Sequence, residues 1–195
     1  VAHGVIDRLG GKGNVVVLEG LIGLSAQVER RQGINKVLAQ SPNIKVLETK
    51  SANWSRAEAQ SLMENWLTSH GKTINGVISH NDEMALGAIE AMKARGIDFA
   101  THPVGGIDGL TDALEAVKRG EMSTTLQDAN AQAQGSIDLA LKVLIGPSYK
   151  PTSDIWNQYP GQLSWDDGKK TEYLVPWTPV TSENVDRLLA IRRAG

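Results

Sequence analysis

The sequence predicts an α/β fold built on a doubly wound parallel sheet. Short runs of β-branched residues, such as the three consecutive valines within residues 14–19, are typical of parallel strands that are covered on both faces. These runs alternate with amphipathic segments long enough to form helices of three or more turns. Such alternation predicts a parallel sheet with helices packed on both of its faces.

Five strand and helix pairs are expected after a short helix at residues 2–9. Glycines within residues 10–13 end that first helix. The predicted strands are residues 14–19, 44–48, 76–79, 103–105 and 123–126. The helices predicted to follow them are residues 25–39, 56–69, 82–95, 110–119 and 130–144, and residues 106–109 form the turn after the fourth strand.

Polar residues predict where two of these helices begin. Ser25 is the expected N-cap of the helix at 25–39, and Asn81 or Asp82 is the expected N-cap of the helix that ends at Gly96. Asn81 and Asp82 directly follow a predicted strand. They should therefore lie at the carboxyl edge of the sheet, where ligands bind in open α/β folds.

Residues 147–195 differ in composition from the rest of the chain. Five prolines and three tryptophans in this part predict an extended arm with short strands. Aromatic side chains of this size bury against other groups, which argues against a flexible linker. Residues 181–186 supply hydroxyl groups followed by acidic residues, and this pattern predicts a final short helix.

The composition excludes several classes of partner. The 195 residues carry a net charge of -2 without a basic block, so we expect no nucleic-acid binding. There is no Cys, which excludes disulfides and thiolate metal sites, and no apolar run approaches the ~20 residues of a membrane span. We therefore expect no membrane insertion, while the absence of Cys fits both cytosol and periplasm.

No motif for phosphate, metal or cofactor binding is present. The glycines in residues 20–25 lack the ending of a P-loop and the third glycine of a dinucleotide fingerprint. No two of the four histidines have the spacing of a helical metal pair, so neither a metal nor a cofactor is expected. Because Asp82, Glu83 and Asp108 fall near strand ends, a small acid–base enzyme remains an alternative to the expected non-enzymatic function.

Four residues in chain order supply the parts of a sugar site. Sugar hydroxyls both donate and accept hydrogen bonds, while the ring's C–H face is apolar, so a site needs amides, carboxylates and an aromatic face. Trp54, Asn81, Asp108 and Gln127 provide these groups after successive predicted strands. Alternatively, Trp54 packs in the core or at its rim, Asn81 and Asp108 cap helices, and Gln127 is loop surface.

Residues 81–88, Asn-Asp-Glu-Met-Ala-Leu-Gly-Ala, resemble the signature of the ribose-binding-protein-like sugar-binding proteins of bacterial ABC importers. Residues 18–26, 30–33 and 181–186 are also similar to that family. The resemblance implies a type I periplasmic binding fold that captures a monosaccharide or polyol and delivers it to a membrane permease. It also implies a periplasmic or lipid-anchored extracellular location, and sugar contacts from Trp54, Asn81, Asp108 and Gln127.

The first helix of the similar region departs from the family pattern. Ribose-type members often carry Arg where we align Val28, three residues after Ser25, so a different pentose, a deoxysugar or a polyol is as consistent as ribose. Ser25, Val28 and Arg31 are further candidates for the site. We expect Arg30 to lie on the opposite side of the helix from Val28, and Arg31 to reach the ligand only by bending back.

By this resemblance residues 1–126 form the C-terminal sugar-binding lobe, and the N-terminal lobe is absent from the sequence. Residues 127–146 form a hinge crossing and a helix expected to pack on that absent lobe, and residues 147–195 form the arm. The helix has an apolar face, which we expect to be covered by an absent segment, a second chain or a rearranged packing. The effector-binding domain of a LacI-type repressor is the alternative function.

Overall fold

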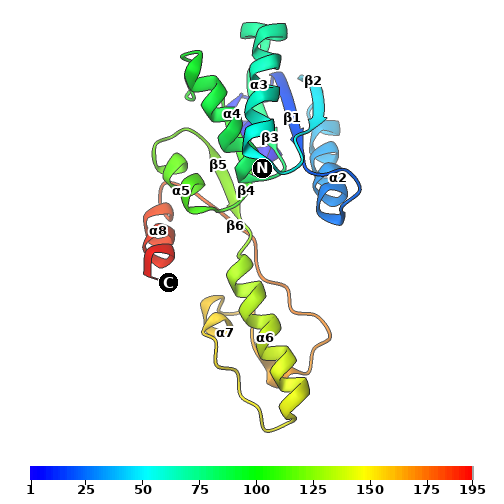
Figure 1. Ribbon diagram of the computed structural model, residues 1–195, viewed down its shortest axis with the longest axis vertical. Helices are drawn as coiled ribbons and strands as arrows, with labels where there is room; N and C mark the ends of the chain where they lie inside the picture. Colours follow the sequence, from blue (N-terminus) through cyan, green and yellow to red (C-terminus); the bar gives the residue numbers. More distant parts are fainter. Residues whose placement is uncertain (195) are drawn as a thin grey trace. The chain divides into compact units, whose positions relative to one another are not determined.

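The computed structural model describes residues 1–194, with side chains described through residue 191. The chain forms two compact units, which are Val1–Leu126 together with residues 179–194, and Gln127–Thr178. Figure 1 labels the helices and strands of both units.

The first unit is organised around a six-stranded sheet with the order β2-β1-β3-β4-β5-β6. Strands β1 to β5 pair in parallel, which confirms the predicted α/β class. The strands are β1 (Gly13–Glu19), β2 (Ile44–Ser51), β3 (Gly76–Ser79), β4 (Val104–Asp108), β5 (Ser123–Leu126) and β6 (Thr178–Pro179). Its helices are α1 (Ala2–Arg8), α2 (Ser25–Ala39), α3 (Arg56–His70), η1 (Gly71–Thr73), α4 (Asp82–Ala94), α5 (Thr111–Lys118) and α8 (Val185–Ala194).

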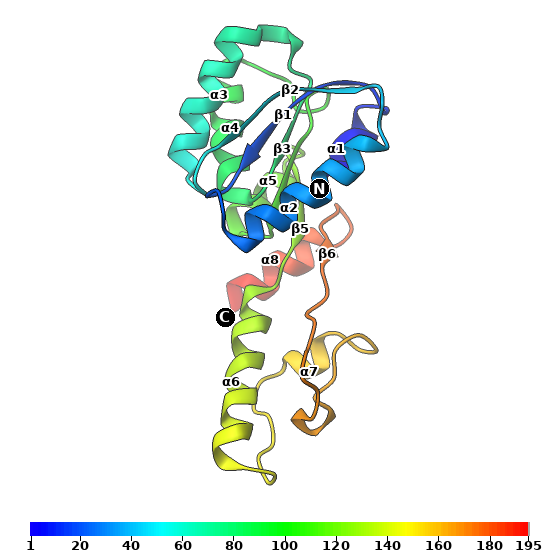
Figure 2. The same ribbon diagram turned by 90° about the vertical axis from the view of Figure 1, so that its right-hand side faces the viewer.

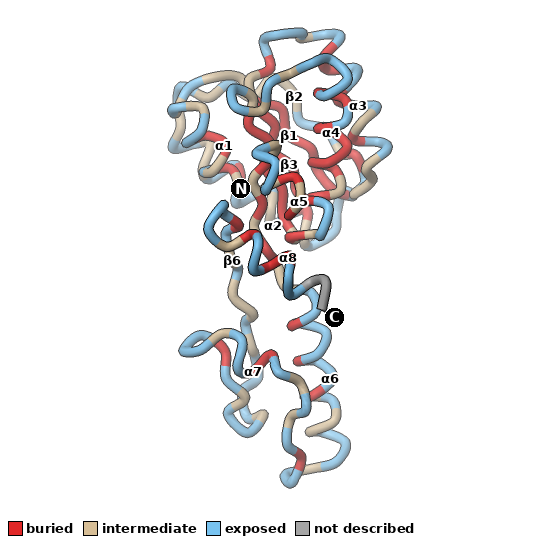
Figure 3. The backbone as a smooth tube through the Cα atoms, turned by 90° about the vertical axis from the view of Figure 1, so that its left-hand side faces the viewer, coloured by how far each residue is buried: buried red, intermediate tan, exposed pale blue. Residues whose placement is uncertain are grey.

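The sheet of the first unit is buried on both faces. Val16 and Leu18 of β1 belong to a core cluster with α3 and α4, whereas Val15 and Val17 belong to a cluster with α1 and α2. Figure 2 shows these two pairs of helices on opposite faces of the sheet, and Figure 3 shows that its strands are mostly buried. Alternate residues of one strand thus serve two cores, which explains the continuous apolar run.

Two details of the first unit differ from the sequence prediction. Strand β4 continues through Asp108, so residues 106–108 belong to a strand instead of a turn. Helix α2 has Leu24 as its N-cap and Ser25 as its first residue, and it shows no side-chain capping bond. The prediction of Ser25 as the cap was therefore wrong, because the helix begins one residue earlier than the capping rule placed it.

Two helical glycines provide a matched test of the packing between α3 and α4. A Cβ atom on Gly87 of α4 would lie 2.1 Å from the main-chain oxygen of Arg56, while a Cβ atom on Gly33 of α2 would meet nothing within 4 Å. We expect Gly87→Ala to lower the free energy of unfolding by about 2 kcal/mol or more, and Gly33→Ala to raise it by about 0.5 kcal/mol. Urea denaturation of both variants checks this, and equal effects would contradict the close helix packing.

The second unit is built around α6 (Ala129–Ile145), α7 (Ile155–Gln158) and η2 (Asp166–Gly168). Its organising residue is Asp138, which is 1% exposed. The Asp138 carboxylate accepts hydrogen bonds from the Tyr149 hydroxyl at 2.6 Å, the Thr152 N–H at 3.1 Å and the Trp156 Nε1–H at 2.8 Å, and also from Ser153. Burial alone would raise the pKa of Asp138, but the side-chain hydrogen bonds outweigh burial and hold that pKa below its usual range.

One side of α6 is covered within the second unit and another side is bare. Leu139 packs against a cluster that includes Ile155 and Trp156. Ile137 and Leu144 nevertheless remain 60% and 80% exposed. Packing within the described part of the chain is therefore insufficient to cover the apolar face of α6.

The C-terminal segment is divided between the two units. The Val180 N–H donates to the Thr124 oxygen at 2.9 Å, and α8 adds apolar residues to a cluster with Leu114 and Leu126. The predicted final helix is present as α8. Residues 147–194 thus contain α7 and η2 before the final helix, and residues 179–194 belong to the first unit, whereas an extended arm with short strands was expected before that helix.

Candidate functional site

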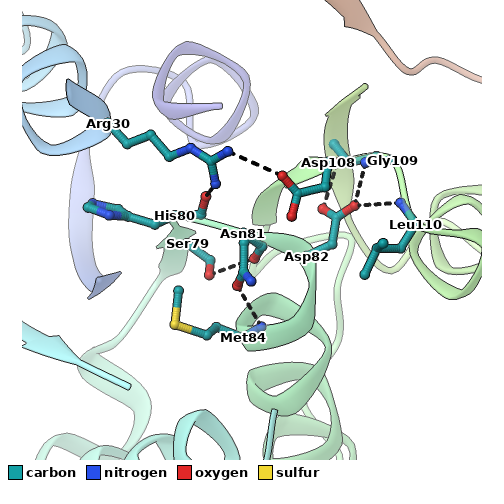
Figure 4. Close-up of polar contacts among 10 residues, drawn as sticks. Arg30, Ser79, His80, Asn81, Asp82, Met84, Asp108, Gly109 and Leu110 are labelled. Atoms are coloured by element: carbon teal, nitrogen blue, oxygen red, sulfur yellow. Dashed lines mark hydrogen bonds and ion pairs between the residues drawn. The ribbon is translucent and has the colours of Figure 1, made fainter. Parts of the chain in front are cut away.

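Asn81 begins helix α4 at the carboxyl end of β3. Its side-chain Oδ1 accepts a hydrogen bond from the Met84 N–H at 3.0 Å, and its main-chain oxygen accepts from the Ser79 hydroxyl at 2.9 Å (Figure 4). Asn81, and not Asp82, is therefore the N-cap. The cap uses only one end of the amide, so the Nδ2 group of this 7% exposed residue is available for a second role.

Asp108 ends the neighbouring strand β4 and pairs with Arg30 of α2. The Nη2 atom of Arg30 lies 3.2 Å from Asp108 Oδ1, and the Nη1 atom donates to the main-chain oxygen of His80 (Figure 4). The two side chains are 13% and 30% exposed, respectively. Burial raises the pKa of Asp108, and the positive charge of Arg30 opposes that rise.

Arg30 lies on the opposite side of α2 from Val28, as expected, but the Arg30 side is the one that faces Asp108. Val28 and Arg31 were the candidates on this helix, but Val28 is 40% exposed and Arg31 pairs with Glu19 at 3.2 Å. Helix α2 turns Gln27 and Ile34 inward, and position 30 lies between them on the same side. Arg31 has the equivalent spacing of four and three residues from these two positions, so the spacing alone does not identify Arg30.

Trp54 lies beside Arg30 in the loop after β2. Its indole ring lies against Gly20, where an added Cβ atom would be 2.0 Å from the ring. The Arg30 guanidinium carbon is 5.5 Å from the centre of the Trp54 ring, and the His80 ring centre is 6.2 Å from it. The structure therefore brings Trp54 close to the Arg30–Asp108 pair, although part of its surface is used for packing.

Asp82 is buried behind the site and holds the turn after Asp108. Its Oδ2 atom accepts from the Gly109 N–H at 2.7 Å and the Leu110 N–H at 3.0 Å, and its Oδ1 atom accepts from the Thr124 hydroxyl at 2.6 Å. Burial raises the pKa of Asp82 to about 6 against these hydrogen bonds, and the charge of Asp108 adds to the rise. The nearby His80 is also buried; burial, together with the charges of Arg30 and Arg31, lowers its pKa to about 4.

These two shifted groups predict opposite pH dependences of stability. Folding raises the pKa of Asp82. The contribution of protonated Asp82 to the free energy of unfolding is therefore fully present below pH ~4 and is lost as the pH rises to about 6. The pKa of His80 is lowered, so its contribution is present above pH ~6.5 and is lost as the pH falls to about 4. Each contribution is on the order of 3 kcal/mol, and the two nearly cancel between pH ~4 and ~6.

Single substitutions should separate the two effects. We expect the stability of His80→Gln to fall as the pH rises from about 4 to about 6, and that of Asp82→Asn to rise over the same interval. Urea denaturation followed by circular dichroism at several pH values measures both. If the free energy of unfolding of both variants depends on pH as it does in the unmodified protein, the shifted pKa values of Asp82 and His80 are wrong.

Three further site residues were predicted, which are Ser25, Val28 and Gln127. Ser25 is exposed on the first turn of α2, and Val28 is exposed further along this helix. Gln127 is the first residue of the second unit, so the structure does not place it with Trp54, Asn81 and Asp108. Across the described part of the chain, His and acidic side chains form no group suited to hold a metal ion, and none of the described helices is long and apolar enough to span a membrane.

Comparisons with known proteins give several relatives that are described as binding proteins. The xylitol-binding protein of Mycolicibacterium smegmatis is 44% identical over 145 residues, covering 74% of this chain and 41% of that protein. The putative rhizopine-binding protein of Rhizobium meliloti is 43% identical over 145 residues, covering 73% of this chain and 47% of that protein. The chain thus spans about half the length of the curated relatives it matches.

Solved structures agree with these relatives. An ABC transporter solute-binding protein from Bacillus halodurans with bound myo-inositol superposes with a TM-score of 0.79 at 32% identity, covering 97% of this chain and 58% of that one. A periplasmic solute-binding protein from Actinobacillus succinogenes with bound D-allose gives a TM-score of 0.78 at 31% identity, covering 95% and 59%. Residues 1–148 match the family described as periplasmic binding protein domain. The chain therefore belongs to the periplasmic binding protein family, as the resemblance implied.

Proposed function

We propose that the first unit forms one wall of the sugar- or polyol-binding cleft of an ABC importer's solute-binding protein. The observation that carries this proposal is the Arg30–Asp108 pair, which lies beside Asn81 and Trp54 at the carboxyl edge of the sheet. A carboxylate, an amide, a guanidinium group and an aromatic ring are the groups that hydroxyls and an apolar sugar face require. The names of the relatives, which include xylitol- and ribose-binding proteins, support the same class of ligand.

The charges of the site favour a neutral ligand. The positive charge of Arg30 is balanced by Asp108, and Arg30 also donates to the His80 oxygen. The carboxylate of Asp108 would repel an anionic sugar. The positive charge of Arg30 would not offset this repulsion, because Asp108 already balances it. We therefore expect neutral monosaccharides and polyols to bind, and sugar phosphates to be excluded.

The second wall of the cleft is, in this proposal, a further lobe of the protein. The curated relatives are about twice as long as the matching part of this chain. The exposed Ile137 and Leu144 of α6 would pack on that lobe, and Gln127 would reach the ligand from the crossing between lobes. The ligand would favour the closed state by contacting both walls, and the closed protein would dock on a membrane permease in the periplasm or at the outer cell surface.

Isothermal titration calorimetry on the full-length protein that contains this chain tests the proposal. The ligands are xylitol, D-ribose, D-allose, myo-inositol and D-ribose 5-phosphate. We expect saturable binding of at least one neutral ligand and none of the phosphate, with the bound sugar recovered unchanged because no covalent step is involved. Failure of every neutral ligand to bind, or preferential binding of the phosphate, would overturn it, and a sugar product would establish an enzyme instead.

A further inference from the structure

The turn that carries Asp108 has an unfavourable backbone conformation. Asp108 has a φ angle of 123°, and Gly109 follows with a φ angle of 71°. The first value is rare for a residue with a side chain and is unfavourable, so such a residue persists only where its surroundings hold it. The orientation of Asp108 therefore depends on whatever holds this turn.

Asp82 supplies hydrogen bonds that hold the turn from a different helix. Its carboxylate accepts from the two main-chain N–H groups that directly follow Asp108, those of Gly109 and Leu110. Leu110 is the N-cap of α5 and its side chain makes no capping bond, so the bond from its own N–H to Asp82 helps to fix where this helix begins. The Thr124 hydroxyl of β5 fixes the other carboxylate oxygen at 2.6 Å.

The packing around Asp82 leaves it little freedom to move. Asp82 is 0% exposed, and a Cβ atom on Gly106 would lie 2.3 Å from its Oδ1 atom. A Cβ atom on Gly109 would lie 2.6 Å from the Leu126 side chain, so the turn is confined on that side as well. Because Asp82 is fully buried and accepts hydrogen bonds from three groups, it acts on the site through its neighbours instead of contacting a ligand.

We propose that Asp82 is a positioning residue that sets the orientation of Asp108 relative to Asn81 in the binding site. Asn81 and Asp82 are adjacent in the chain, and Asn81 is fixed by its own capping bond to Met84. One dipeptide thus orients two of the polar groups that meet the ligand, one directly and one through the turn. This inference rests on the proposed sugar-binding function.

A double-mutant cycle separates positioning from general support of the fold. In the full-length protein, with xylitol and myo-inositol as the titrated probes, we expect Asp82→Ala to weaken binding by about 10- to 100-fold. In an Asp108→Ala background the same substitution should weaken binding by less than about 3-fold, because the group that it positions is already absent. A residue that only stabilises the fold would reduce affinity equally in both backgrounds.

Conservative variants provide the controls. Asp82→Asn should keep affinity within about 3-fold, since the amide oxygen still accepts from Gly109 and Leu110 and the Thr124 hydroxyl can accept from the new NH2 group. Asp98→Ala, which removes an exposed carboxylate that accepts from the Ala100 N–H, should leave affinity unchanged. If Asp82→Ala does not fold, Thr124→Val replaces it in the cycle. We expect Thr124→Val to lower the affinity for the probe by about 3- to 10-fold, and to have no such effect in the Asp108→Ala background.

The outcomes distinguish this inference from the proposed function. Equal losses from Asp82→Ala, or from Thr124→Val in its place, in both backgrounds would overturn the positioning role, as would wild-type affinity in Asp82→Ala. If Asp108→Ala itself leaves affinity unchanged, or if no probe binds the unmodified protein, the proposed function fails first.

Discussion

Replacing Asp108 with Ala is expected to weaken sugar binding by the full-length protein about 100-fold. The substitution removes a carboxylate acceptor for ligand hydroxyls, and hydrogen bonds to charged groups contribute about 1.5–3 kcal/mol each. It also removes the ion pair of Asp108 with Arg30, whose side chain is only 13% exposed. Calorimetric titration with the tightest-binding neutral sugar measures the effect.

Asp112→Ala is the matched control for this substitution. Asp112 is a second aspartate close in sequence to Asp108, but its side chain is 65% exposed and it pairs with Arg56 at the surface. Exposed ion pairs contribute about 0–1 kcal/mol, so Asp112→Ala should bind the sugar as the unmodified protein does. Similar affinities for both variants would exclude Asp108 from the binding site.

Replacing Asp138 with Ala is expected to destabilise the second unit by about 3–5 kcal/mol. The side-chain donors of Tyr149, Ser153 and Trp156 would lose their acceptor, and each buried polar group left unpaired costs about 1–3 kcal/mol. We expect hydrogen exchange of the α6 amides to accelerate strongly, while the amides of β1 and β3 in the first unit keep their protection.

Asp154→Ala tests whether any acidic residue near α7 would give this result. Asp154 is exposed and precedes α7 without a side-chain capping bond. Its replacement should change the exchange of α6 amides little, because no hydrogen-bond network depends on it. Unchanged exchange in Asp138→Ala would contradict the assignment of Asp138 as the organising residue of the second unit.

The sequence predicted the sheet well because the relevant signals are local. The valines of β1 are buried on both faces, and this double burial is what a continuous apolar run indicates. Asn81 and Asp108 could likewise be placed at the carboxyl edge, since each lies at or directly after the end of a strand. Residues 106–109 were predicted as a turn because glycines are typical of turns, but strand β4 continues through Asp108.

Features that depend on long-range packing could not be read from the sequence. Whether Arg30 or Arg31 faces Asp108 depends on the rotation of α2 about its axis, which is set by the packing of Ile34 in the core. The donors to Asp82 lie 27, 28 and 42 residues away along the chain, so no local pattern revealed that it holds the turn after Asp108. The same reason applies to Asp138, whose partners Tyr149 and Trp156 lie 11 and 18 residues away, in the segment after α6 and in α7.

A competitive native mass spectrum of the full-length protein tests the central claim most directly. The protein and its Asp108→Ala variant are each mixed with equal concentrations of xylitol, D-ribose, D-allose, myo-inositol and D-ribose 5-phosphate. The account predicts an adduct with the mass of one neutral sugar or polyol on the unmodified protein, lost on denaturation and strongly reduced in the variant. An unmodified protein without any neutral adduct, or a variant that retains the adduct at equal intensity, would contradict a sugar site built on Asp108.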